Sequence, residues 1–122
     1  MSEHYFDTYA LIEIIYANPN YNKFSGSIAF CTTRLNLMEL YYGLLRKYDK
    51  KTAELYYDRF LPFCHEITDE IIKEAVEFRF LRKQQKLSYV DCIGYIMAKQ
   101  RGIPFLTGDK EFEHLPGVEF VK

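Results

Sequence analysis

Short apolar runs alternate along this chain with longer segments in which apolar residues recur at helical spacing. The runs at 5–7, 28–32, 63–67, 105–107 and 118–121 are too short for a helix, and each predicts a short strand. Helices are predicted at 10–15, from 33 to about 45, at 52–60, from 68 to about 86 and at 88–102, with a helical turn at 110–114. Strands that alternate with helices predict an α/β fold of stacked layers around a parallel sheet.

Polar residues at the segment ends support these helix boundaries. Thr33 can cap the helix that follows it. Apolar residues repeat along that helix at helical spacing: Leu35, Met38, Tyr42 and Leu45. The helix from 68 opens with Asp69 and Glu70 and ends in a basic stretch, which the helix dipole favours.

The composition is that of an ordinary globular protein. Of the 122 residues, 48% are hydrophobic and 27% charged, so we predict one domain over residues 1–122. No apolar run approaches the roughly 20 residues that a membrane span needs, and the acidic first residues do not resemble a signal peptide. We therefore expect no membrane contact. The cysteines are odd in number, lie in apolar surroundings and form no Cys-x-x-Cys pair, which predicts reduced thiols and a cytoplasmic location; they are Cys31, Cys64 and Cys92.

Two acidic residues come directly after predicted strands. Asp7 closes the run at 5–7, and Asp109 comes just after the run at 105–107. Ligands of parallel α/β sheets bind beyond the carboxyl ends of the strands. Both carboxylates are therefore predicted at the ligand-binding edge of the sheet.

Two further acids lie within predicted helices and lack a partner there. Glu39 and Asp91 have no Lys or Arg three or four residues away in either direction. A carboxylate on an otherwise apolar helix face is costly unless something pairs with it. A glycine one turn further along each helix, Gly43 or Gly94, is expected to leave room beside the carboxylate.

Each acid also has an ordinary structural explanation when it is taken singly. Asp7 can cap the first helix, Asp91 can complete a capping box, and Asp109 can belong to a Gly-Asp turn in which Gly108 allows a tight bend. Glu39 can pair with a distant arginine. Taken together, however, four unpaired carboxylates would repel each other unless a cation lay among them.

All-oxygen sites suit hard divalent ions such as Mg²⁺ or Mn²⁺. The chemistry that such a site supports is hydrolysis of a phosphodiester, in which the metal activates water and stabilises the leaving oxygen.

The same residues carry a resemblance to a known family. The segments "FDTYALIEII", "TTRLNLMELYYGLL" and "LSYVDCIGYIMAKQRGIPFLTGDKEFEHLPGVEFV" resemble the PIN-domain nucleases, and in particular the VapC-type toxins of toxin–antitoxin pairs. The resemblance spans nearly the whole chain. It implies a three-layer α/β/α fold with a central, mainly parallel sheet, and a metal-dependent endoribonuclease that binds Mg²⁺ or Mn²⁺. It implies that four acids hold the metal and carry catalysis: Asp7, Glu39, Asp91 and Asp109.

The resemblance also points to supporting residues. Thr8 matches the hydroxyl residue that follows the first aspartate, and Thr107 matches the one two residues before the last. Glu111 stands where many relatives carry another aspartate. It can join the site or lie in the first turn of a helix, and we favour the second.

The partners implied by the resemblance are RNA, a cognate antitoxin and a second copy of the chain. The net charge is −1, so RNA would have to be held by local basic groups, for which we name Arg46, Lys47, Arg82 and Lys83. Each of these is also explained as part of a solvated helix surface. Four tyrosines are expected to contribute to a homodimer or else to pack two helices together: Tyr41, Tyr42, Tyr56 and Tyr57.

Three alternatives belong to other classes. A haloacid-dehalogenase-type phosphatase needs a second Asp two residues after the first, where this chain has Tyr9. A receiver domain would need paired acids at its first strand and a late lysine after a strand, and neither is clear. The alternative that stays open is a non-catalytic PIN-fold module that binds RNA or protein.

Overall fold

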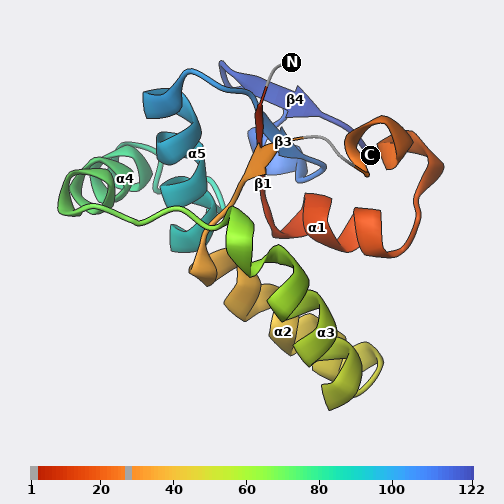
Figure 1. Cartoon of the computed structure of the whole chain (residues 1–122). Coiled ribbons are helices and arrows are strands. Elements are labelled where there is room, and N and C mark those ends of the chain that lie inside the picture. The colour runs from red at the N-terminus through yellow and green to blue at the C-terminus, as the bar shows by residue number, and fades with distance from the viewer. Residues whose placement is uncertain (1–2, 27–28) are drawn as a thin grey trace.

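Residues 3–26 and 29–122 are described by a computed structural model, in which helices cover a small central sheet (Figure 1). The four strands all run parallel, in the order β2-β1-β3-β4. They are β1 (His4–Phe6), β2 (Phe30–Cys31), β3 (Phe105–Thr107) and β4 (Val118–Phe120). The predicted α/β fold with a parallel sheet is therefore confirmed.

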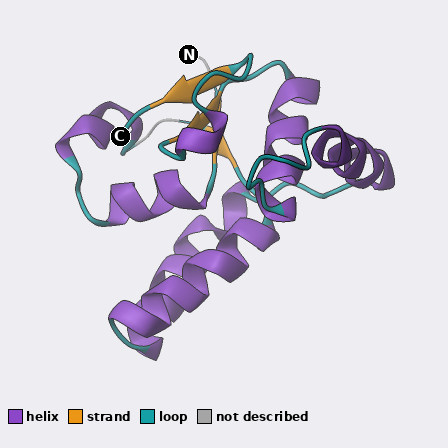
Figure 2. Cartoon of the chain, turned by 180° about the vertical axis from the view of Figure 1, so that it is seen from behind, coloured by secondary structure: helices purple, strands orange, loops and turns teal. Residues whose placement is uncertain are grey.

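In the described part of the chain, five α-helices and three short 3₁₀ helices connect these strands. They are α1 (Thr8–Ile15), α2 (Arg34–Lys47), α3 (Lys50–Phe60), α4 (Asp69–Leu81) and α5 (Tyr89–Arg101), with η1 (Pro19–Phe24), η2 (Leu61–Phe63) and η3 (Lys110–Phe112). Helices α2 and α3 form a hairpin that projects from the body of the molecule, as both views show (Figures 1 and 2).

The sheet separates two apolar cores, which makes the fold three layers deep. Because side chains alternate along a strand, Tyr5 and Phe105 enter one core, with α4 and α5. Phe6 and Leu106, the next residue on each strand, enter the other core, with α1, α2 and α3. Strands of three residues therefore suffice, because each buries side chains on both faces.

Side-chain caps set where the helices begin. Thr33 and Ser88 accept hydrogen bonds from the backbone N–H groups of Asn36 and Asp91, so the predicted caps of α2 and α5 are confirmed. The predicted start of α3 at 52 was two residues late. Asp49 caps this helix, and the residue at 52 donates its backbone N–H to that cap (2.8 Å).

The run at 63–67 was wrongly predicted to be a strand. Its first residue belongs to η2, and Cys64 forms only an isolated parallel bridge with Thr32. The neighbouring strand β2 is two residues long, so its outer edge offers little backbone to pair with. The predicted start of that strand, at residue 28, lies outside the described residues.

The apolar repeat along α2 faces outward rather than into the core. Met38, Tyr42 and Leu45 are 55%, 62% and 42% exposed. The buried side of the helix carries Asn36 together with three leucines: Leu37, Leu40 and Leu44. Helical spacing predicted the helix correctly. It did not predict which face is buried, because α2 carries apolar residues on two faces.

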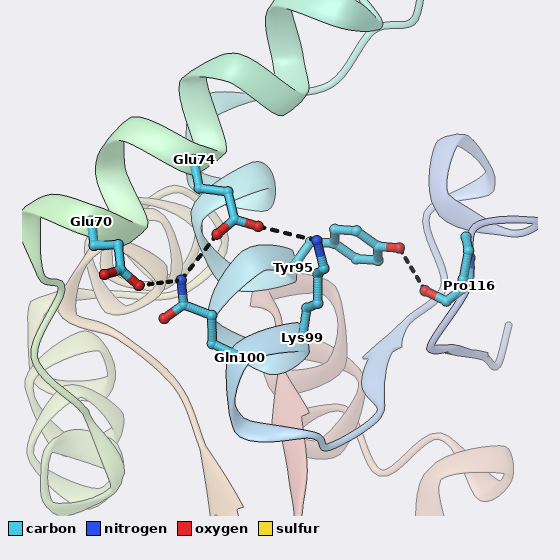
Figure 3. Close-up of polar contacts among 6 residues, drawn as sticks. All are labelled: Glu70, Glu74, Tyr95, Lys99, Gln100 and Pro116. Atoms are coloured by element: carbon cyan, nitrogen blue, oxygen red, sulfur yellow. Dashed lines mark hydrogen bonds and ion pairs between the residues drawn. The ribbon is translucent and has the colours of Figure 1, made fainter.

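Polar contacts tie the outer helix α4 to α5 (Figure 3). Gln100 Nε2 donates to a carboxylate oxygen of Glu70 (3.2 Å) and of Glu74 (3.1 Å), and Lys99 Nζ pairs with Glu74 (3.1 Å). The Tyr95 hydroxyl, also on α5, donates to the Pro116 carbonyl, 2.6 Å away. Helix α5 is thus fixed between α4 and the loop before β4.

Helix α5 also packs closely on the first strand at a glycine. A Cβ atom added to Gly94 would lie 2.6 Å from Tyr5 Cε1 and 2.9 Å from the Tyr5 hydroxyl. The expectation that Gly94 leaves room for a carboxylate is therefore wrong, because the space holds a tyrosine ring. At Gly43 in α2 an added Cβ would meet nothing within 4 Å.

This difference predicts opposite effects of the same substitution. Gly94→Ala should lower the free energy of unfolding by about 1–3 kcal/mol, because the buried Tyr5 ring would have to shift. Gly43→Ala should raise it by up to about 1 kcal/mol, because alanine favours a helix interior. Urea unfolding of both variants tests this, and a Gly94→Ala variant as stable as the wild type would contradict the packing.

Candidate active site

Three of the four predicted acids line one cleft at the carboxyl ends of β1 and β3. We call it the acid cleft; its volume is about 430 Å³. Its lining residues are Asp7, Tyr9, Asp91, Gly108, Asp109, Lys110 and Lys122. Segments far apart in the sequence thus meet at the edge where parallel sheets bind ligands.

Asp7 lies between β1 and α1 and is 2% exposed. Its Oδ1 accepts the backbone N–H of Ala10 (2.9 Å), so it caps α1, while its own N–H donates to the Leu106 carbonyl (3.4 Å). The capping role that the sequence left open is therefore real, and it coexists with a position in the cleft. The cap fixes the direction in which this carboxylate points.

Asp109 follows β3 and caps η3. Its Oδ1 accepts the backbone N–H of Glu111, and its own N–H donates to the hydroxyl of Thr107, each at 3.0 Å. The Thr107 side chain also lowers the pKa of the Asp7 carboxylate, so it acts on both acids. This buried threonine therefore connects the two acids that follow neighbouring strands.

Gly108 is needed for space and not for the predicted tight bend. Its φ is not among the positive values found in the described backbone. A Cβ at this position would lie 2.2 Å from Tyr9 Cε1 and 2.6 Å from the Val121 carbonyl oxygen. The absence of a side chain lets Tyr9 and the chain after β4 close over this turn.

Asp91 enters the cleft from the first turn of α5. Its backbone N–H donates to Ser88 Oγ (3.0 Å), which completes the N-terminal cap. No Lys or Arg lies at helical spacing from Asp91, as noted from the sequence. Its carboxylate therefore lines the cleft with the other acids and has no cationic partner on its own helix.

Glu39 does not line the acid cleft but is joined to it by a threonine. The Thr8 hydroxyl donates to Glu39 Oε1 (2.7 Å), and Thr8 directly follows Asp7. No ion pair of Glu39 with an arginine is found within residues 3–26 and 29–122, so the salt bridge considered from the sequence is not present there.

A buried network holds Thr8 in turn. Asn36 Nδ2 donates to Thr8 Oγ1 (3.1 Å), while Asn36 Oδ1 accepts from the hydroxyls of Tyr5 and of Thr33 (2.9 Å for Thr33). Two donors at Oδ1 fix which way the amide points, so its NH₂ faces Thr8. Because Thr8 accepts that bond, its own hydrogen is directed at Glu39.

Glu111 turns away from the acids. Its Oε1 accepts the backbone N–H of Lys86 (3.0 Å), which ties the loop between α4 and α5 to η3. It lies in the first turn of η3, the arrangement favoured from the sequence.

Burial and mutual repulsion dominate the electrostatics of the cleft. Burial raises the pKa of Asp7 to about 8, and the charges of Asp91 and Asp109 add to this rise. Burial also raises the pKa of Asp91 to about 6, with contributions from Glu39 and Asp109. Hydrogen bonds from Thr107 and from the Ala10 N–H partly oppose the rise at Asp7.

The donor set fits a divalent ion. All candidate ligand atoms are carboxylate oxygens, which suit Mg²⁺ or Mn²⁺, and a cation would offset the repulsion that raises both pKa values. In the described part of the chain no three His, Cys, Asp or Glu side chains are grouped closely enough to hold one ion jointly. Mg²⁺ does not need such a group, because it is commonly bound by one or two carboxylates and several waters.

The predicted RNA contacts lie elsewhere. Lys47 Nζ lies 4.0 Å from the centre of the Tyr16 ring, and the Arg46 guanidinium lies over the Tyr42 ring. Arg82 lies over a ring at the end of α4 and lines a larger cavity, of about 1000 Å³, between α4, α5 and the starts of β3 and β4. Lys83 lies over the Phe80 ring. The acid cleft, as described, includes none of these four cations among its lining residues.

Other residues of the site were missed in the sequence. Asn36 carried a signal, because it is a polar residue on a helix face that otherwise presents leucines and lies one turn before Glu39. Lys110 also carried one, because it directly follows Asp109 in the sequence. Lys122 carried none, since only the folded chain brings it to the cleft beside Tyr9.

The sequence matches the family model of the PIN domain over residues 4–118, and the chain therefore belongs to the PIN-domain family. The resemblance drawn from its motifs is confirmed. It matches none of the curated proteins at the sequence level.

Solved structures of VapC proteins share the fold. A Mycobacterium tuberculosis VapC20, a toxin that cleaves the sarcin-ricin loop, gives a TM-score of 0.81 at 17% identity over 98% of this chain and 99% of that one. A toxin–antitoxin complex from Klebsiella pneumoniae gives 0.73 at 20% identity over 95% of each chain. A DNA-bound VapBC from Salmonella typhimurium gives 0.73 at 20% identity over 98% of this chain and 97% of that one. Likeness at this level of identity establishes the fold.

No helix in the described part of the chain is long and apolar enough to cross a membrane.

The raised pKa of Asp7 predicts how the metal-free protein responds to pH. A folded-state pKa of about 8, against an ordinary value of 3.8, gives stability that is complete below about pH 4 and lost as the pH rises through 8. Asp7→Asn keeps an acceptor for the cap and removes the charge, so at pH 8 in EDTA it should melt roughly 5 °C higher than the wild type.

Asp49→Asn provides the matched control for this experiment. Asp49 is also an N-cap, but hydrogen bonds to Thr52 lower its pKa, so its stabilisation is lost only in acid. Between pH 5 and 9 this variant should follow the wild-type melting curve in slope. A wild type whose melting temperature rises steadily from pH 5 to 8 in EDTA would contradict the crowded site.

Proposed function

We propose that this protein is a metal-dependent endoribonuclease and the toxin of a toxin–antitoxin pair. The observation that carries the proposal is the convergence of Asp7, Asp91 and Asp109 in one cleft of a PIN-family chain. One of these acids, Asp7, is nearly completely buried, and burial raises its pKa, with smaller contributions from its negative neighbours. Carboxylates arranged in this way are characteristic of sites that bind a divalent cation and act on phosphodiesters.

Each residue of the site has a separate role in this proposal. One or two of the carboxylates of Asp7, Asp91 and Asp109 would bind Mg²⁺ or Mn²⁺ directly, and the others would act through bound water. Glu39 would lie beside them through Thr8. The ion, when bound, supplies Lewis-acid chemistry at the phosphoryl oxygens. The Ala10 N–H holds the Asp7 carboxylate in place, so that it need not reorganise when substrate enters.

An antitoxin partner is supported by the structural neighbours. Two of those described above are complexes of a toxin with its antitoxin, one of them on DNA. The proposal for this chain is a protein partner encoded with it, and a cytoplasmic location follows from such a role.

Cleavage of RNA is the direct test. Purified protein should cut RNA in Mg²⁺ or Mn²⁺ and stop in EDTA. Asp7→Asn and Asp109→Asn should each lower the rate by roughly a hundredfold or more, because loss of a ligand exceeds the 10–100-fold cost of losing an outer partner. The exposed cap variant Asp49→Asn should keep wild-type activity.

Two outcomes would contradict the proposal in different ways. Cleavage that survives in Asp7→Asn would belong to another site or to a contaminating nuclease. Binding of RNA without any cleavage by the wild type, in either metal, would favour the non-catalytic PIN-fold module.

Homodimer formation stays a prediction, but the structure changes which of the four tyrosines can lie at the interface. Tyr41 and Tyr57 pack edge to face between α2 and α3 (6.0 Å between ring centres), and Tyr56 stacks on Phe60. Tyr42 is the one of the four predicted tyrosines that is mostly exposed. It lies in the outward row of α2 together with Met38 and Leu45.

We expect this row to drive self-association, since it offers contiguous apolar area outside the core. Sedimentation of the wild type should show a dimer at tens of micromolar, and Tyr42→Ser should shift it toward monomer without loss of melting temperature. Phe80→Ser, which removes an exposed ring on α4, is the matched control. Dissociation by Phe80→Ser alone would move the interface to α4.

A further inference from the structure

The acid cleft contains two lysines besides its acids. Lys110 begins η3, directly after Asp109, and Lys122 follows β4. An acidic cleft repels RNA, so cations at its wall are the groups most able to hold a phosphate there. Neither lysine was singled out in the sequence.

Both lysines are free to bind an external anion. Within residues 3–26 and 29–122 neither forms an ion pair, and both side chains are exposed. Lys23, Lys99 and Arg101, by contrast, pair with glutamates. The two cleft lysines therefore neither neutralise the acids by direct contact nor fasten one element to another.

The backbone that carries Lys122 is firmly held. The Val121 N–H donates to the Thr107 carbonyl (2.9 Å), and the Tyr21 hydroxyl donates to the Val121 carbonyl (2.6 Å). Asn20 Nδ2 donates to the carbonyl of Lys122 itself (2.9 Å). Only the side chain of this residue is left to move.

Tyr9 directs that side chain over the cleft. Lys122 Nζ lies 5.4 Å from the centre of the Tyr9 ring, within the range of a cation–π contact. The ring is half-buried and occupies the space that a Cβ of Gly108 would fill, so it cannot retreat toward β3. Tyr9 is thus a fixed platform for a mobile ammonium group.

We propose that Lys110 and Lys122 bind RNA phosphates next to the scissile bond, and that Tyr9 acts as the positioning residue for Lys122. This inference rests on the proposed function and adds the contacts by which the acid cleft takes its substrate. It replaces the basic residues named from the sequence, none of which is among the residues that line the acid cleft.

Binding of RNA separates this proposal from its rivals. The probe is a short fluorescein-labelled single-stranded RNA, titrated with Asp7→Asn protein in Mg²⁺ so that it is not cut. Adding Lys110→Gln and Lys122→Gln should weaken binding about tenfold. It should also lower the slope of log K against log salt by about 1.4, which is 0.7 for each lost phosphate contact.

Lys51→Gln with Lys73→Gln removes the same charge from exposed positions outside the cleft and should leave both quantities unchanged. Arg46→Gln with Lys47→Gln tests the contacts named from the sequence. The proposal is overturned if the Arg46 and Lys47 pair weakens RNA binding more than the cleft pair does. It is also overturned if the Lys51 and Lys73 pair weakens RNA binding as much as the cleft pair does.

Tyr9 variants test the positioning role. Tyr9→Phe keeps the ring and should bind RNA like the parent, whereas Tyr9→Leu should lose several-fold in affinity, and only when Lys122 is present. If Tyr9→Leu loses the same RNA affinity in the Lys122→Gln background as in the protein that keeps Lys122, then Tyr9 does not act through the lysine.

Steady-state cleavage in the otherwise wild-type protein gives the second readout. The cleft pair of substitutions should raise KM about tenfold with kcat nearly unchanged, because the contacts are lost equally from substrate and transition state. If the wild type cleaves RNA and the cleft pair matches it in KM and affinity, this inference fails and the proposed function stands. If the wild type does not cleave RNA at all, the proposed function fails first.

Discussion

The burial of one carboxylate among others is the constraint on which this structure depends. Asp7 is nearly inaccessible, yet its charge is met by other carboxylates instead of a basic side chain. Such a placement is costly unless the charge is removed or a cation is supplied. The fold tolerates this burial because Asp7 also caps α1. The carboxylate whose burial is costly is therefore the one that starts the first helix.

A chain of hydrogen bonds connects the acids to the core of the protein. Glu39 is held by Thr8, Thr8 by Asn36, and Asn36 by the hydroxyl of Tyr5 in the middle of the sheet. Because Tyr5 also fills the space beside Gly94, the same ring sets the distance between β1 and α5, the helix that carries Asp91. Core packing and site geometry are therefore one arrangement here, and a change of core volume at α5 would reach the acids.

Much of this could be predicted from the sequence because it depends on local patterns. The short strands, the caps at Thr33 and Ser88 and the strand-end position of Asp7 follow from residue type and spacing. The rest depends on tertiary contact. The outward face of Met38 is decided by which side of α2 meets the sheet, and the role of Gly108 by a tyrosine ring a hundred positions earlier in the chain.

The distribution of charge, more than its sum, decides how such a chain meets a polyanion. A net charge of −1 predicts no attraction at a distance. In the folded chain, however, several cations are already paired: Lys23, Lys99 and Arg101 each form an ion pair with a glutamate. A cation engaged in this way gives up part of its attraction to an incoming phosphate. Cations beside the acids that have no carboxylate partner can therefore outweigh a larger number of paired cations elsewhere. The neighbours of a basic residue in the fold thus say more about its function than a basic run in the sequence.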